Sequence, residues 1–196
     1  MPTKKLLSPL TLALTLLAAP VLHAGPAFVG PENCKSCHKD EYADWERSKH
    51  ARAFELLQAG KRKGAKKKAG LDPDKDYTHD QKCLKCHTTG YGEPGGFESI
   101  ETTAHRAGIG CEMCHGPGER YREIHKTQRL DFKRADTKAA GQTYGSEDPQ
   151  VCKKCHGHAD SPFTSKVDDK YTDDVGALMK QNFRAFHDFY ELIGDH

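Results

Sequence analysis

The eight cysteines constrain this chain more than any other feature, because they fall into four pairs and a histidine follows each pair at once. The four C-x-x-C-H motifs run over residues 34–38, 83–87, 111–115 and 152–156, and no cysteine is left over. Histidine is 12 of 196 residues, so it would follow all four pairs by chance with odds on the order of one in 100,000. The four motifs therefore share a chemical cause.

This spacing is typical of covalent haem attachment. The two thiols add to the vinyl groups along one porphyrin edge, and the adjoining histidine presents its imidazole to the iron. Disulfides, zinc sites and thioredoxin-like redox pairs are alternatives for an even set of cysteines, but each leaves the four histidines unexplained. The sequence predicts four haem c groups, attached through Cys34, Cys37, Cys83, Cys86, Cys111, Cys114, Cys152 and Cys155, with His38, His87, His115 and His156 as iron ligands.

The first 24 residues have the three parts of an export signal. Two lysines precede an apolar run over 6–22, and the small residue Ala24 follows. A membrane anchor is the alternative, but serine, threonine and proline interrupt the run and no stop-transfer charges follow it. We expect cleavage after Ala24, which leaves a periplasmic domain over 25–196 that does not span the membrane.

Composition indicates an unusual core. Only 36% of the residues are hydrophobic, 30% are charged and the mean hydropathy is -0.80, which is polar for a chain that buries a side-chain core. We expect one mainly α domain of short helices and loops wrapped around four haems, with little β-structure, because glycine and proline clusters such as 92–96 and 116–118 mark loops and no strand alternation is visible.

Charge gives no support to nucleic-acid binding. The formal charge of +2 falls to zero when the two signal lysines are removed, so the exported domain has no basic excess. The lysine-rich run over 61–68 is either a solvated face or a docking patch for an acidic partner.

Two histidines outside the motifs lie at informative distances from them. His50, within an apolar helical pattern over 41–57, follows His38 by twelve residues, and His125 follows His115 by ten. Along a helix these separations are roughly 18 Å and 15 Å, too long for both imidazoles of a pair to bind one iron. We therefore expect an exchange, in which His50 binds the third haem iron and His125 the first.

A third histidine outside the motifs, His187, lies on the apolar face of a predicted helix over 175–193, and we expect it to bind the fourth haem iron. The second haem then has His87 alone, and an open, five-coordinate iron is the favoured interpretation. His79 and His105 are the alternatives for a sixth ligand.

The chain resembles the tetrahaem cytochrome c-554 family of ammonia-oxidising bacteria over nearly all of residues 25–196. The resemblance rests on the four motifs in order and on the runs 71–73, 75–78, 110–118 and 167–172, together with Gly90, Gly92, Gly95 and Gly96. It implies a mainly helical protein with haems one and three stacked in parallel, three bis-histidine haems and one high-spin haem. It also implies the distal ligands given above.

The resemblance further implies what the protein does. Pro162 and Phe163, after Ser161, match the family segment that covers the open face of haem two. Family members accept electrons from hydroxylamine oxidoreductase and pass them toward a membrane-bound cytochrome and quinone. We expect a periplasmic electron carrier rather than an enzyme. A reductase of nitric oxide or another small molecule at haem two, and a gas-binding sensor, are the alternatives.

Overall fold

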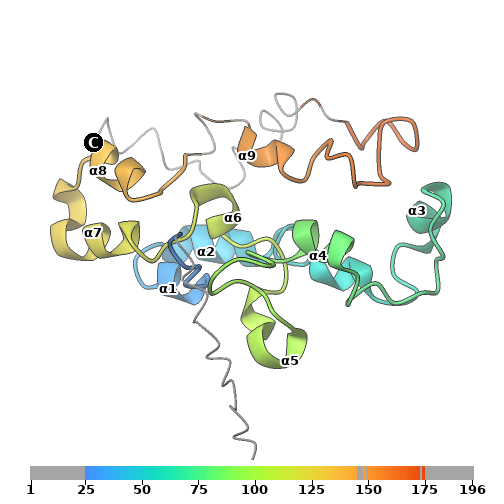
Figure 1. Ribbon diagram of the computed structural model, residues 1–196, viewed down its shortest axis with the longest axis horizontal. Helices are drawn as coiled ribbons and strands as arrows, with labels where there is room; N and C mark the ends of the chain where they lie inside the picture. The colour runs from blue at the N-terminus through green and yellow to red at the C-terminus, as the bar shows by residue number, and fades with distance from the viewer. Residues whose placement is uncertain (1–24, 145–147, 149, 173, 175–196) are drawn as a thin grey trace, which may run out of the picture.

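The computed structural model describes residues 25–144, 148, 150–172 and 174, which form short helices joined by loops (Figure 1). Nine α-helices lie in this part of the chain: α1 Glu32–Lys35, α2 Lys39–Glu46, α3 Lys63–Lys68, α4 Gln81–His87, α5 Ile100–Thr103, α6 Glu112–His115, α7 Tyr121–Gln128, α8 Arg134–Ala139 and α9 Gln150–Lys153. The 3-10 helices are η1 Phe54–Leu57, η2 Ala104–Arg106 and η3 Arg129–Asp131.

Helices dominate the described ranges as predicted. They contain no named strand, and their only ladder pairing is an isolated bridge between Thr88 and Ala107. None of the helices found there has the length and hydrophobicity needed to cross a membrane. The predicted signal over 1–24 lies outside the described residues.

The described helices follow an elongated path that doubles back on itself (Figure 1). Helices α1, α2, α4 and α6 lie in the middle, α3 lies at one end, and α7 and α8 lie together at the other. Helix α9 packs on α6, and the chain after α9 returns toward α3. An ion pair of 3.6 Å between Lys68 of α3 and Asp168 ties the returning segment in place.

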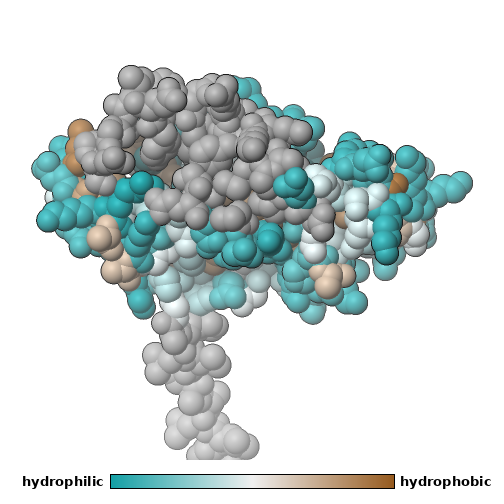
Figure 2. All heavy atoms as spheres, turned by 90° about the horizontal axis from the view of Figure 1, so that it is seen from above, coloured by the Kyte–Doolittle hydropathy of each residue, from teal (hydrophilic) through white to brown (hydrophobic). Residues whose placement is uncertain are grey.

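The apolar core is small and lies mainly beside the second motif. Phe54, Leu57, Tyr77, Leu84 and Phe97 form one buried cluster. Other buried apolar side chains of the described ranges are Phe28, Pro31, Tyr42, Ala53, Tyr121 and Val151. Hydrophilic residues dominate the described surface seen in Figure 2. So few buried apolar groups leave helices of four to eight residues with little packing support from side chains alone.

The apolar pattern over 41–57 does not form one helix as expected. Helix α2 ends at Glu46, the chain turns, and η1 begins at Phe54. The Ser48 hydroxyl oxygen accepts the N–H of Ala51 at 3.1 Å, a local bond that competes with helix continuation. The His50 carbonyl accepts the N–H of Ile109 at 2.9 Å. His50 therefore lies in a turn that is fixed to a distant segment.

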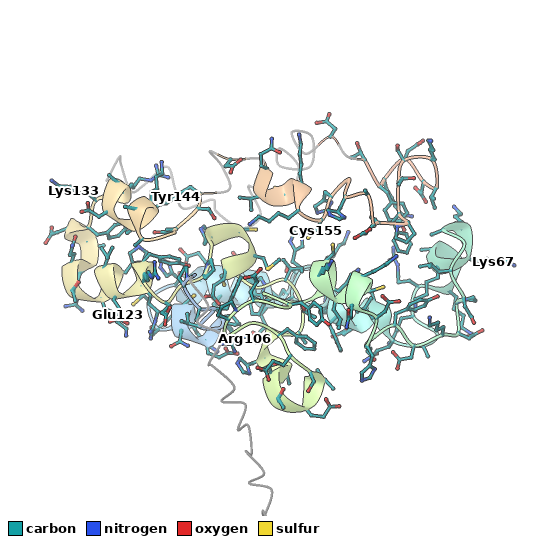
Figure 3. All side chains as sticks on the ribbon, viewed as in Figure 1. Lys67, Arg106, Glu123, Lys133, Tyr144 and Cys155 are labelled. Carbon is teal, nitrogen blue, oxygen red and sulfur yellow. The ribbon has the colours of Figure 1, made fainter. Side chains whose placement is uncertain are left out.

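The lysine-rich run is partly used to hold the structure. Lys66 is buried, and its Nζ donates to the Gln58 carbonyl at 2.7 Å and lies 5.1 Å from the ring centre of Tyr77. Lys63 pairs with Asp74, whereas Lys67 points away from the molecule (Figure 3). The run therefore contributes internal contacts through Lys63 and Lys66 and also exposes Lys67.

Gly108 lies beside two candidate haem ligands, His50 and His87, and is packed tightly there. Its φ is +92°, and an added Cβ would lie 2.2 Å from the Ala51 carbonyl oxygen. Its N–H donates to the His87 carbonyl at 3.1 Å. We predict that Gly108→Ala lowers the stability of the haem-loaded protein by at least about 2 kcal/mol, from strain and overpacking, as measured by thermal unfolding in circular dichroism.

The matched control for that substitution is Gly64→Ala in α3, where an added Cβ meets nothing within 4 Å. Alanine is the better helix former by about 1 kcal/mol, so this variant should unfold at the same or a higher temperature. Equal melting temperatures for Gly108→Ala and the unchanged protein would show that the chain relaxes around residue 108 without cost.

Candidate haem-binding sites

Each C-x-x-C-H motif forms one helical turn. The histidine N–H donates to the carbonyl of the first cysteine at 3.0 Å in motif one and at 2.9 Å in motifs three and four, and motif two lies within α4. Because this i to i+4 bond sets the repeat of an α-turn, the first cysteine and the histidine face the same side. All four motifs therefore present two thiols and one imidazole in a similar local frame.

Motifs one and three touch through their thiols. Cys34 and Cys111 share a hydrogen bond, which is the main cause of the lowered pKa of Cys34 and the raised pKa of Cys111. The two attachment sites are therefore immediate neighbours, although 77 residues separate them in the sequence. This contact agrees with the expectation that haems one and three lie together.

Motifs four and two extend this arrangement, so that the four motifs form a row. The pKa of Cys114 in motif three is raised to about 11, first by burial and then by Cys152 of motif four. Cys155 of motif four, labelled in Figure 3, shares a hydrogen bond with Cys86 of motif two, which lowers the pKa of the Cys86 thiol to about 7. The motifs thus adjoin one another in the order one, three, four, two.

Backbone carbonyls orient two of the motif imidazoles. His87 Nδ1 lies 2.7 Å from the Ala53 carbonyl oxygen, and His115 Nδ1 lies 3.3 Å from that of Thr143. A carbonyl only accepts, so Nδ1 carries the proton and Nε2 keeps the lone pair that a metal needs. No side-chain pattern marks Ala53 or Thr143 for this role, which is why the sequence did not reveal it.

The surroundings favour the neutral, metal-binding form of these rings. Burial lowers the pKa of His87 and of His156, and in His87 it outweighs the opposing effect of the Ala53 carbonyl. Neutral imidazoles and paired thiols form the donor set of a c-type haem. The residues present therefore fit this cofactor.

His50 faces motif four, not motif three. Its ring centre lies 6.4 Å from that of His156, with the ring planes at 80°. Two imidazoles that hold one metal ion at roughly 2.0 Å from each nitrogen need ring centres roughly 6 Å apart. Burial and then the charge of His156 lower the pKa of His50. The turn after α2 carries His50 to His156, so this geometry favours pairing with the fourth haem over the expected pairing with the third.

His125 has the features of a distal ligand beside motif one. It lies on α7, and its ring packs 5.7 Å from Tyr121 and 4.3 Å from Phe132 between ring centres. Its Nε2 is buried without a hydrogen-bond partner among the described residues. Burial and then the charge of His38 lower its pKa, so His38 acts on it electrostatically.

The remaining distal positions have weaker support. His187 lies outside the described residues. His105 contacts the guanidinium of Arg106 through Nε2, and it lies against Gly30, which precedes motif one. The His79 Nδ1 lies 3.1 Å from the Thr78 hydroxyl. His79 also lines an open pocket of about 330 Å³ to which the motif-two cysteines and His87 contribute nothing.

Pro162 and Phe163 lie in a turn close to motif two. The Phe163 N–H donates to the Ser161 hydroxyl at 3.2 Å, and its ring lies 5.2 Å from the Tyr171 ring centre. Asp160, two residues before Pro162, acts on the pKa of Cys86 by its charge. The segment is therefore a neighbour of the second attachment site, while its role as a cover over haem two stays a prediction.

Paired thiols and neutral imidazoles in adjoining C-x-x-C-H turns define a multihaem c-type cytochrome, a protein of electron transport. The family model for cytochrome c554 and c-prime matches residues 33–116. Cytochrome c-554 of Nitrosomonas europaea is 36% identical over 198 residues, which cover 92% of this chain and 83% of that protein. This chain belongs to the cytochrome c-554 family.

A solved structure supports the same assignment. The reduced state of cytochrome c554 from Nitrosomonas europaea matches with a TM-score of 0.73 at 37% identity, covering 81% of this chain and 84% of that one. The mainly helical, multihaem fold expected from the sequence is confirmed.

Proposed function

We propose that the protein is a periplasmic carrier that holds four haem c groups and transfers single electrons between redox proteins. The observation that carries this proposal is the row of four adjoining motifs. Cysteines of motifs one and three share a hydrogen bond, as do cysteines of motifs four and two, and α6 of motif three packs on α9 of motif four. Haem iron, when bound, supplies the one-electron chemistry. The polypeptide's part is to tether the groups close together and to fix their ligands.

Two observations support a specific set of iron ligands. The ring contact of His50 with His156 favours these two for haem four, and the electrostatic effect of His38 on the buried His125 favours these two for haem one. His115 belongs to haem three. Because His50 lies beside His156 of motif four, we propose that His187, expected above at haem four, is instead the distal ligand of haem three. His87 would be the only ligand of haem two, since no second imidazole lies against its ring among the residues that the structure describes.

The row of motifs also suggests the two ends of the electron path. Its ends are motif one and motif two, so haems one and two are the natural sites of entry and exit. The family resemblance suggests a hydroxylamine-oxidoreductase-like donor and a membrane-bound, quinone-linked cytochrome as acceptor.

Haem number and ligation are tested together on protein purified from the periplasm. We predict that mass spectrometry finds residues 25–196 plus four haems, and that low-temperature electron paramagnetic resonance of the ferric protein shows one high-spin signal beside low-spin signals. Colourless protein with the mass of the bare chain would refute the proposal. Uniformly low-spin iron would instead assign His79 or His105 to haem two.

A further inference from the structure

Glu112 occupies a variable position within motif three, yet its side chain is almost fully buried at 2% exposed. Its Oε1 accepts the N–H groups of Val29 at 2.8 Å and Gly118 at 2.7 Å, and its Oε2 accepts the N–H of Gly30 at 2.8 Å. Both oxygens accept and neither donates, which is the hydrogen-bond pattern of an ionised carboxylate.

These three bonds join two haem-attachment sites. Val29 and Gly30 lie immediately before α1, which carries motif one, and Gly118 follows motif three. The fit is close, since a Cβ added to Gly118 would lie 3.1 Å from Glu112 Oε1 and 2.8 Å from Val29 Cγ2. Glu112 therefore holds Val29 and Gly30, which lead into motif one, against α6 of motif three.

No ion pair involves Glu112 in the described part of the chain. The buried Arg106 donates from Nη2 to the Phe28 carbonyl at 3.0 Å instead. Neighbouring groups respond to the charge. The pKa of Tyr121 is raised, first by burial and then by Glu112, and Glu112 is also one of the smaller causes of the raised pKa of Cys111.

We propose that Glu112 is a positioning residue that joins the sites of haems one and three, and that its buried negative charge lowers the reduction potentials of both. A fixed anion in a water-poor site stabilises the more positive ferric form over the ferrous form. Backbone N–H dipoles offset part of this field but carry no net charge. The inference rests on the proposed attachment of haem at motifs one and three.

The test compares Glu112→Gln with the unchanged protein by a redox titration followed by visible and electron paramagnetic resonance spectra. Glutamine keeps the shape of the side chain and removes its charge. We expect the equilibrium constants for reduction of haems one and three to rise at least tenfold, about 59 mV for one electron, while those of haems two and four stay unchanged. Glu98→Gln, which neutralises an exposed glutamate, is the matched control and should move no potential.

A shorter carboxylate separates charge from packing. Glu112→Asp keeps the charge and weakens the three hydrogen bonds, so it should lower the melting temperature while the potentials of haems one and three remain low. It also serves as the test if the glutamine variant does not mature. A rise of these two potentials in Glu112→Asp, or a shift of all four or of none in Glu112→Gln, would overturn the inference.

Mass spectrometry keeps this inference distinct from the function on which it rests. Four haems with unchanged potentials in Glu112→Gln would reject the role of Glu112 alone. Absence of haem from the unchanged protein would reject the proposed function itself.

Discussion

Polypeptide produced without haem attachment, with its eight cysteines reduced, will show no cooperative thermal unfolding. The main buried cluster contains only five residues, all beside motif two. The described helices are no longer than eight residues, and such helices are marginal without a packing surface. At about 25 cal/mol for each Å² of apolar surface buried, contact with four porphyrins would replace the missing side-chain core.

The measurement is circular dichroism of residues 25–196 made in a cytoplasm without the haem-attachment machinery, compared with the haem-loaded protein. The loaded protein should give one sigmoidal transition and the unloaded polypeptide a featureless slope. A sigmoidal transition in the unloaded, reduced polypeptide would contradict the prediction. It would show that the cluster around Phe54 and Leu84 suffices to fold the chain.

Local features of this protein were predictable because their causes are local. The four attachment turns follow from C-x-x-C-H spacing, and α7 follows from the pattern around His125. The identity of the haem that His50 serves was not predictable. The spacing argument assumed a helix from His38 to His50, but α2 ends at Glu46. The partner depends instead on a turn held by Ser48 and by the distant Ile109.

The order of the motifs in space has no signature in the sequence. It is set by contacts between thiols far apart in the chain, such as Cys86 with Cys155. The role of Glu112 could not be predicted from the sequence for a related reason. It stands at an unconstrained position of its motif, and its main partners, Val29 and Gly30, lie 83 and 82 residues away. Backbone N–H groups can be recruited from any residue type except proline, so no residue pattern records the choice.

The position of His50 beside His156 leads to the second prediction with a large expected effect. Replacing His50 with alanine should convert haem four, rather than haem three, from low-spin to high-spin, because His156 would lose the imidazole that lies 6.4 Å away between ring centres. Electron paramagnetic resonance of the ferric protein should lose one low-spin signal and gain one high-spin signal. His158→Ala, which removes an exposed imidazole near the same motif, should leave the spectrum unchanged.

A background without haem four identifies the affected centre. In a protein with Cys152→Ala and Cys155→Ala the fourth haem cannot attach, so adding His50→Ala should change none of the remaining signals. If His50 bound haem three, the same addition would turn that haem high-spin. The first result supports the pairing of His50 with His156 across motif four. The second would support the original expectation from helical spacing, in which His50 binds haem three and His125 binds haem one.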